Sequence, residues 1–166
     1  MRALAASVAE ERPGLVAVCE IEPGEALAFA TRFAMQWAYR GHQALFWNDA
    51  FRVTRVRDLY LPAAGPLPFE RRGFLYAEAQ FANRTCVLAA THFSEERRAR
   101  IAELRFARSL LRESACDAIF CAHLRETRIA FGDLGFREEG APGQSAEHAY
   151  VRGLQQVRFT VKRASL

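Results

Sequence analysis

Residues 117–127 read DAIFCAHLRET, and this stretch decides how the chain is expected to fold. Residues 118–121 form a short apolar run, which is typical of a buried strand, and a polar turn with His123 and Arg125 follows it. A side chain at the end of a buried strand reaches solvent while the strand stays fixed. We therefore expect this strand end to form part of a functional site.

Three other segments end in the same way. LVAVCEIEP (15–23) carries Glu20 just beyond an apolar run, and TCVLAATHF (85–93) carries His92 beyond another. EHAYVRG (147–153) supplies two more polar residues, which alternation along a strand places on opposite faces. A fold that brings these strand ends together would gather one cluster: Glu20, His92, His123, Arg125, Glu147 and His148.

These motifs, in this order, resemble those of the endonuclease/exonuclease/phosphatase superfamily. Segment 15–23 is similar to the family's strand that ends in a Gln-Glu pair, and AATHF (89–93) to its Thr-His-Leu strand end. CAHLRET (121–127) stands where the family has Gly-Asp-Phe-Asn or Gly-Asp-Leu-Asn, and residues 147–166 are similar to its Ile-Asp-His-Ile-Phe-Val segment and the strand after it. The resemblance implies an α/β (α+β) fold, a two-layer β-sandwich flanked by helices.

The resemblance also implies roles for individual residues. The family holds Mg²⁺ with carboxylates and Asn, because a hard cation takes oxygen ligands, and the metal and a His then activate water against a phosphoester. Glu20 would be a metal ligand, and His92 would supply acid/base chemistry or a phosphate contact. Glu147 keeps a carboxylate at the position of a family Asp, one methylene longer.

Two departures from the family pattern change the expected chemistry. His123 replaces the family Asp, and Arg125 replaces the family Asn. A neutral imidazole suits Zn²⁺ or Mn²⁺ better than Mg²⁺, and a permanent cation repels a metal while attracting an anion such as phosphate. The pocket is therefore expected to be about two charge units more positive than the family's.

The chain is also expected to lack the family's first and last strands. Unpaired strand edges attract partner strands, so we predict a homodimer through an exposed sheet edge.

Three functions remain open on the sequence. The first is a degenerate domain, or pseudoenzyme, with weak or lost Mg²⁺-dependent phosphoester hydrolysis and an anion- or partner-binding role. The second is an active metal-dependent phosphodiesterase or nuclease with altered ligands. The third is a site repurposed for a transition metal.

The candidate partners are a phosphate-containing ligand or nucleic acid, and the candidate metals are Mg²⁺, Mn²⁺ and Zn²⁺. The candidate catalytic residues are His92, His123 and Arg125, and the candidate metal ligands are Glu20, His123, Glu147 and His148.

Length and composition set the wider expectations. A chain of 166 residues is long enough for one domain with its own core, so residues 1–166 are predicted to form a single domain. The net charge of +4 permits nucleic-acid binding without requiring it. No apolar run is long enough to span a bilayer, and we expect a bacterial-type cytoplasmic protein with reduced, buried cysteines.

Local patterns predict the elements. Gly41 is expected to end the second helix, Ser94 to cap the third, and the Pro-rich loop at 61–69 to form a flap. Residues 42–56 and 73–91 are expected to form hairpins. The predicted helices cover 3–12, 25–39 and 94–113, and the predicted strands cover 15–19, 42–47, 51–56, 73–81, 85–91, 118–121, 147–152 and 157–162.

Overall fold

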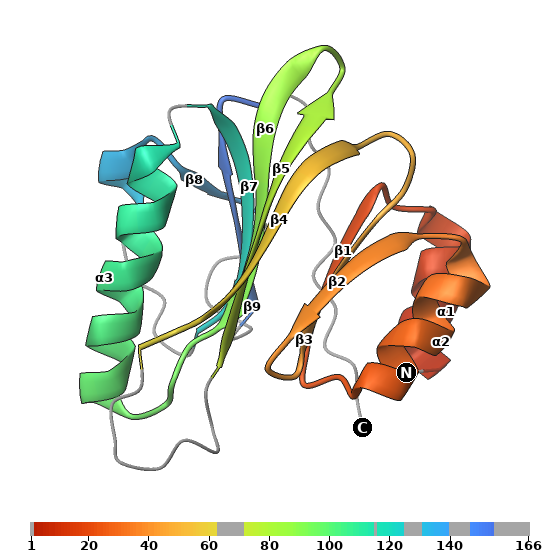
Figure 1. Cartoon of the computed structure of the whole chain (residues 1–166), viewed down its shortest axis with the longest axis horizontal. Coiled ribbons are helices and arrows are strands. Elements are labelled where there is room, and N and C mark those ends of the chain that lie inside the picture. The colour runs from red at the N-terminus through yellow and green to blue at the C-terminus, as the bar shows by residue number, and fades with distance from the viewer. Residues whose placement is uncertain (1, 63–71, 115, 125–130, 140–146, 155–166) are drawn as a thin grey trace.

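Two β-sheets face each other, and helices cover the outer side of each (Figure 1). The structure is a computed structural model and describes residues 2–62, 72–114, 116–124, 131–139 and 147–154. Within these ranges, the smaller sheet has the strand order β1-β3-β2 and the larger has the order β4-β5-β6-β7-β9-β8. The predicted two-layer sandwich flanked by helices is confirmed.

Helices and strands alternate at the start of the chain, and a series of strands follows. Their bounds are α1 Arg2–Glu11, β1 Leu15–Cys19, α2 Pro23–Phe33, β2 Gln36–Arg40, β3 Gln43–Trp47, β4 Arg52–Tyr60, β5 Gly73–Phe81, β6 Arg84–His92, α3 Arg97–Glu113, β7 Asp117–His123, η2 Gly132–Leu134, β8 Arg137–Glu139 and β9 Glu147–Arg152.

Apolar side chains fill the spaces between these layers. The inner layer, between the two sheets, includes Leu45, Leu75 and Leu88. A second cluster lies between the larger sheet and α3, and a third lies between the smaller sheet and its helices. Because successive residues of a strand point to opposite faces, β6 and β7 contribute alternately to the inner layer and to the α3 side. This alternation decides which strand-end side chains can meet.

The second helix ends earlier than predicted. It stops at Phe33, where Ala34 adopts the left-handed conformation with φ 52° and the Met35 amide bonds the Ala30 carbonyl at 3.0 Å. The residues that follow form β2. The apolar residues over 25–39, which would lie on almost all sides of a single helix, therefore belong to a helix followed by a strand. Gly41 instead lies, with His42, in the turn between β2 and β3.

The predicted hairpin over residues 42–56 is wrong. β3 pairs with β1 and β2, whereas β4 pairs with β5 in the other sheet. The short Asn48–Ala50 connection therefore crosses from one sheet to the other. The hairpin of β5 and β6 is confirmed, with left-handed Ala82 and Asn83 in its turn. A short polar connection marks a change of strand, but it does not decide which sheet the next strand joins.

The cap of α3 is Glu96, and Ser94 stands further back. The Glu96 carboxylate accepts from the amides of Arg98 and Ala99, at 2.9 and 2.6 Å, which satisfies two donors of the first turn. These contacts hold the pKa of Glu96 below its usual value. Ile101, whose spacing with Leu104 and Leu111 predicts a place on the apolar face of this helix, is exposed instead.

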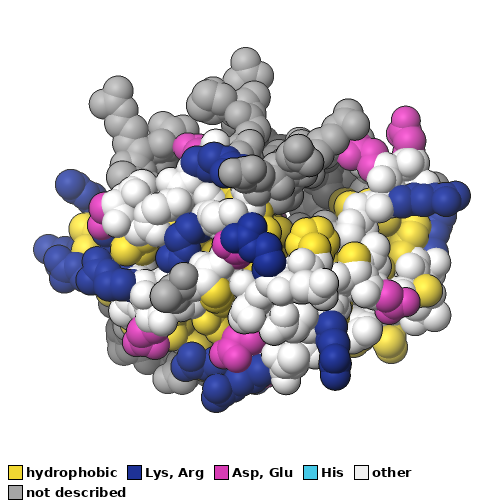
Figure 2. All heavy atoms as spheres, turned by 90° about the horizontal axis from the view of Figure 1, so that it is seen from above, with side chains coloured by type: hydrophobic (Ala, Val, Ile, Leu, Met, Phe, Trp, Pro, Cys, Tyr) yellow, Lys and Arg dark blue, Asp and Glu magenta, His cyan; other side chains and the backbone are white. Residues whose placement is uncertain are grey.

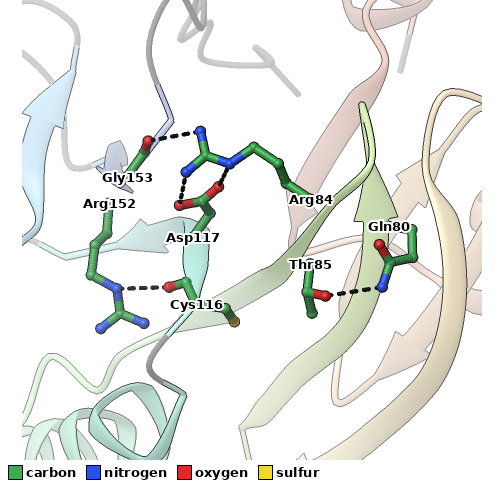
Figure 3. A network of polar contacts seen from close by, with 7 residues as sticks. All are labelled: Gln80, Arg84, Thr85, Cys116, Asp117, Arg152 and Gly153. Carbon is green, nitrogen blue, oxygen red and sulfur yellow. Dashed lines mark hydrogen bonds and ion pairs between the residues drawn. The ribbon is translucent and has the colours of Figure 1, made fainter.

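A polar network anchors the beginning of β7 (Figure 3). Arg84 binds the Asp117 carboxylate through two nitrogens, at 2.8 and 2.9 Å, and also donates to the Gly153 carbonyl. Arg152 donates to the Cys116 carbonyl at 3.0 Å. These contacts join the starts of β6 and β7 to the end of β9, at the end of the sandwich opposite to the carboxyl ends of β6 and β7.

Replacing Gly153 with alanine is expected to lower the free energy of unfolding by about 2 kcal/mol. Gly153 has φ +76°, and a Cβ added there would overlap the Asp117 carboxylate. Gly24→Ala in α2 is the matched control, because a Cβ there meets nothing within 4 Å; it should be neutral or slightly stabilising. Chemical denaturation measures both variants, and an unchanged Gly153→Ala would contradict the account of this network.

Some expectations fall outside the described residues or are not tested. Of the predicted flap at 61–69, only residues 61 and 62 are described. The predicted strand at 157–162 lies wholly outside the described residues. The homodimer through a sheet edge stays a prediction. In the part of the chain that the structure describes, no helix is long and apolar enough to cross a membrane.

Candidate functional site

The carboxyl ends of β6 and β7 place two imidazoles side by side. These strands are parallel, and their register sets His92 opposite His123. The two ring centroids are 4.3 Å apart, with the rings tilted by 52°. Just beyond the pair, the Phe93 amide donates to the His123 carbonyl at 3.1 Å, which ties the two strand ends together. The predicted meeting of these two strand ends is therefore present in the structure.

Glu20 reaches the same place from the smaller sheet. It follows the last residue of β1 with φ 59°, a left-handed turn that redirects the chain, and its Oε1 lies 3.7 Å from Nδ1 of His92. The Cys19 thiol just before it lies 3.8 Å from the Thr91 carbonyl across the sandwich. The Glu20 side chain is 64% exposed and that of His92 only 14%, so a solvated carboxylate lies beside a shielded imidazole.

Glu147 and Arg125 are placed less fully. The antiparallel pairing of β9 with β7 sets Glu147 opposite His123. Backbone register thus brings a second acidic residue to the same strand ends. The predicted role of Arg125 lies outside the described residues.

His148 does not join this cluster, which corrects its assignment as a ligand beside His123. It is buried on the α3 side of the sheet, where Tyr150 of the same strand also packs. Its Nδ1 lies 2.5 Å from Glu138, and its Nε2 lies 3.0 Å from the Leu124 carbonyl. Strand alternation explains the outcome, because neighbours in β9 face opposite layers.

The described cluster is two imidazoles and one carboxylate. No group of three or more His, Cys, Asp or Glu side chains with metal-holding geometry occurs among the described residues. Glu20 and the imidazoles could supply part of a transition-metal site, and carboxylate oxygens alone suit Mg²⁺. Two adjacent imidazoles can also donate hydrogen bonds to an anion, and they do so with positive charge when protonated.

The Cys86 thiol is not reactive. None of the four cysteines forms a disulfide, and Cys86 is fully buried. Burial raises the pKa of Cys86 to about 11, so it stays a thiol at neutral pH.

Sequence reasoning missed Gln43, the first residue of β3. It pairs with Cys19, the residue before Glu20, and it is only 1% exposed. The available signal was a carboxamide at the head of the otherwise apolar run QALFW. A polar residue inside a buried strand indicates either a hydrogen-bond partner or a function.

Sequence comparisons identify no relative. No protein-family model matches this chain, and no curated protein matches it.

Solved structures, by contrast, share its architecture. A Bacteroides thetaiotaomicron structure described as an endonuclease/exonuclease/phosphatase family protein matches with TM-score 0.76 and 10% identity, over 91% of this chain and 73% of that one. A mannosyl-6-phosphatase of the same organism matches with TM-score 0.75 and 12% identity, over 91% and 75%. TDP2 of D. rerio, complexed with a single-strand DNA product, matches with TM-score 0.72 and 14% identity, over 95% and 78%. Identities this low carry the fold alone, and the chain therefore has the fold of the endonuclease/exonuclease/phosphatase superfamily.

Proposed function

We propose that this chain is a phosphoesterase-like domain whose site binds a phosphate-containing ligand and has weak or lost Mg²⁺-dependent hydrolysis. The observation that carries the proposal is the pairing of His92 with His123 at 4.3 Å between ring centroids. An imidazole takes the position where the family resemblance expects an acidic metal ligand. The site is therefore expected to bind a hard cation less tightly and an anion more tightly.

The charges around the pair support this proposal. Glu20 is the described carboxylate beside the imidazoles, and it is largely solvated, which weakens its field at the site. Arg125 follows His123 by two residues and carries a permanent charge suited to phosphate oxygens. Structural neighbours include a phosphatase and a protein solved with a DNA product, so their named ligands also contain phosphate.

A small phosphate ester is favoured over a long nucleic acid. Nucleic-acid binding relies on many basic side chains gathered along one surface. The net charge of the chain is only +4. On the face seen in Figure 2, which is the end of the sandwich opposite to the candidate site, Arg side chains are interspersed with Asp and Glu. Nucleic acid remains the second candidate, on the strength of the DNA complex of a structural neighbour.

Sulfate is the probe that tests the anion site, because its charge does not change between pH 5.5 and 8, unlike that of phosphate. We expect sulfate to bind at these strand ends, since imidazole N–H groups donate hydrogen bonds to its oxygens. His123→Ala should weaken binding at pH 6 by about tenfold or more, the loss expected for one hydrogen bond to a charged group. Calorimetry or chemical-shift titration gives both values.

Arg55→Gln is the matched control for this test. Arg55 is exposed on β4, where it contacts Glu78, away from the carboxyl ends of β6 and β7. The substitution removes a positive charge without touching the strand ends, so sulfate affinity should be unchanged. Equal losses in both variants would indicate a general charge effect and would contradict the proposed site.

Hydrolysis and metal binding separate the other two functions. With Mg²⁺ or Mn²⁺, turnover of bis(4-nitrophenyl) phosphate should stay close to that of buffer alone. Strong Mg²⁺-dependent turnover that is lost in His92→Ala would establish the active phosphodiesterase instead. A Zn²⁺ or Mn²⁺ titration at pH 7.5 that shows binding by the unmodified chain and none by His123→Ala would favour the transition-metal site.

A further inference from the structure

Gln43 carries a buried carboxamide that the fold does not use. The residue is 1% exposed, and neither Nε2 nor Oε1 has a hydrogen-bond partner among the described residues. A buried polar group without a partner destabilises the folded state, whereas an apolar side chain of similar size avoids that penalty. Packing alone would therefore favour methionine at this position. The presence of a carboxamide at this position is therefore not explained by the stability of the fold.

Strand register places this carboxamide directly beneath the candidate site. Gln43 is paired with Cys19, and paired residues project to the same side of a sheet. Gln43 alternates in phase with Leu45 and Trp47, which pack in the inner layer between the sheets. The Cys19 thiol contacts the Thr91 carbonyl there. Because Glu20 and His92 are the next residues on these two strands, Gln43 lies one residue below the cluster.

Arg40 adds a second unused donor at the same level. It is the other strand partner of Gln43, and its Nε is buried without a hydrogen-bond partner in the part of the chain that the structure describes. Its terminal nitrogens are occupied, since NH1 donates to the Tyr60 hydroxyl at 3.3 Å and NH2 pairs with Asp58. These contacts hold the guanidinium in place and leave its buried Nε–H unused. Together the two side chains offer N–H donors and one carbonyl acceptor.

We propose that Gln43, supported by Arg40, is a ligand-contacting residue that forms the floor of the anion site. The carboxamide N–H donates to a phosphate oxygen, and its carbonyl accepts from a hydroxyl on the same ligand. This combination suits a phosphate monoester of a hydroxylated molecule, or monohydrogen phosphate itself. The proposal rests on the proposed function, because it needs the phosphate to be held by His92 and His123 above.

Contact with the ligand requires a local rearrangement. The carboxamide atoms are covered by their neighbours, but glutamine has three rotatable side-chain bonds. Turning the carboxamide toward the strand ends replaces no existing hydrogen bond, because it makes none. Movement toward a ligand is therefore not opposed by the loss of a contact.

The test is inorganic phosphate binding, measured at pH 6.5 by calorimetry on four proteins: unmodified, Gln43→Met, Gln80→Met and His123→Ala. Gln43→Met should bind phosphate about tenfold more weakly while its melting temperature rises by a few degrees. Gln80→Met is the matched control, because Gln80 is exposed near the far end of β5 and donates to Thr85 (Figure 3). It should change neither phosphate affinity nor the melting temperature by more than a small amount.

Each outcome decides the proposal. If Gln43→Met keeps full affinity while His123→Ala loses it, the anion site stands and the role of Gln43 is refuted. If the unmodified chain binds no phosphate, the proposed function itself fails and the role of Gln43 fails with it. A Gln43→Met protein that melts lower or does not fold would show that the carboxamide serves the structure, which also overturns the inference.

Discussion

Replacing Arg152 with methionine is expected to lower the free energy of unfolding by about 3 kcal/mol. The Arg152 guanidinium donates to the carbonyls of Cys116, Leu111 and Leu134 at 3.0, 3.1 and 3.3 Å. It also donates to the Ser114 carbonyl and hydroxyl, and its charge lies 4.8 Å from the centre of the Phe136 ring.

The expected loss of stability follows from the position of two of these acceptors at the carboxyl end of α3. Leu111 lies in the last turn of α3 and Ser114 just after it, so their carbonyls lack helix partners and carry the negative end of the helix dipole. Methionine keeps much of the apolar stem but returns none of the hydrogen bonds, and several half-buried carbonyls lose their donor at once.

Arg55→Met is the control for charge and size. Arg55 is exposed on β4 and makes a 4.0 Å contact with Glu78, so its loss should change the free energy of unfolding by less than about 0.5 kcal/mol. Urea denaturation followed by circular dichroism compares the two variants. Similar stabilities for Arg152→Met and Arg55→Met would show that the carbonyls find other donors.

The double variant His123→Asp with Arg125→Asn is expected to bind Mg²⁺ at least about tenfold more tightly than the unmodified chain. The first change adds a negative charge, and the second removes a positive one, so the site becomes about two charge units more negative. An aspartate also supplies the oxygen ligands that Mg²⁺ prefers, next to Glu20. The pattern then matches the one that the family resemblance implies.

Gln80→Glu is the matched control, since it adds one acid at the exposed far end of β5, away from the carboxyl ends of β6 and β7. Calorimetric titration with MgCl₂ should show no gain in this control. Adding Glu20→Gln to the double variant should remove most of its gain. An unchanged Mg²⁺ affinity in the double variant would mean that the strand ends do not form a metal-competent pocket even when their charges are restored.

The sequence by itself determined the strands that carry the site. Residues 118–121, 85–91 and 15–19 are short, largely apolar runs that are typical of a buried strand, and a polar residue follows each within two positions. Period-two alternation predicts that Glu147 and His148 face opposite layers, and the structure places His148 on the α3 side. The sequence of one strand is enough to predict which of its side chains face opposite layers, because this alternation does not depend on the neighbouring strands.

Sheet membership was decided only by the tertiary structure. Residues 36–40 are apolar enough to continue α2, and they become β2 because β3 offers them a partner. In the same way, β4 pairs with β5 and not with β3, the strand before it in the sequence. Such pairing depends on contacts between residues far apart in the sequence. Propensity is a weak guide where tertiary pairing competes with it.

The polar contacts of the site also depend on three dimensions. Nothing in residues 43–47 alone shows that Gln43 lies beneath Glu20 and His92, because that proximity comes from the pairing of β1 with β3 and the packing of one sheet on the other. The sequence thus determined which side chains stand at strand ends. The tertiary structure decided which of them meet, because strand register and sheet packing join residues that the chain keeps far apart.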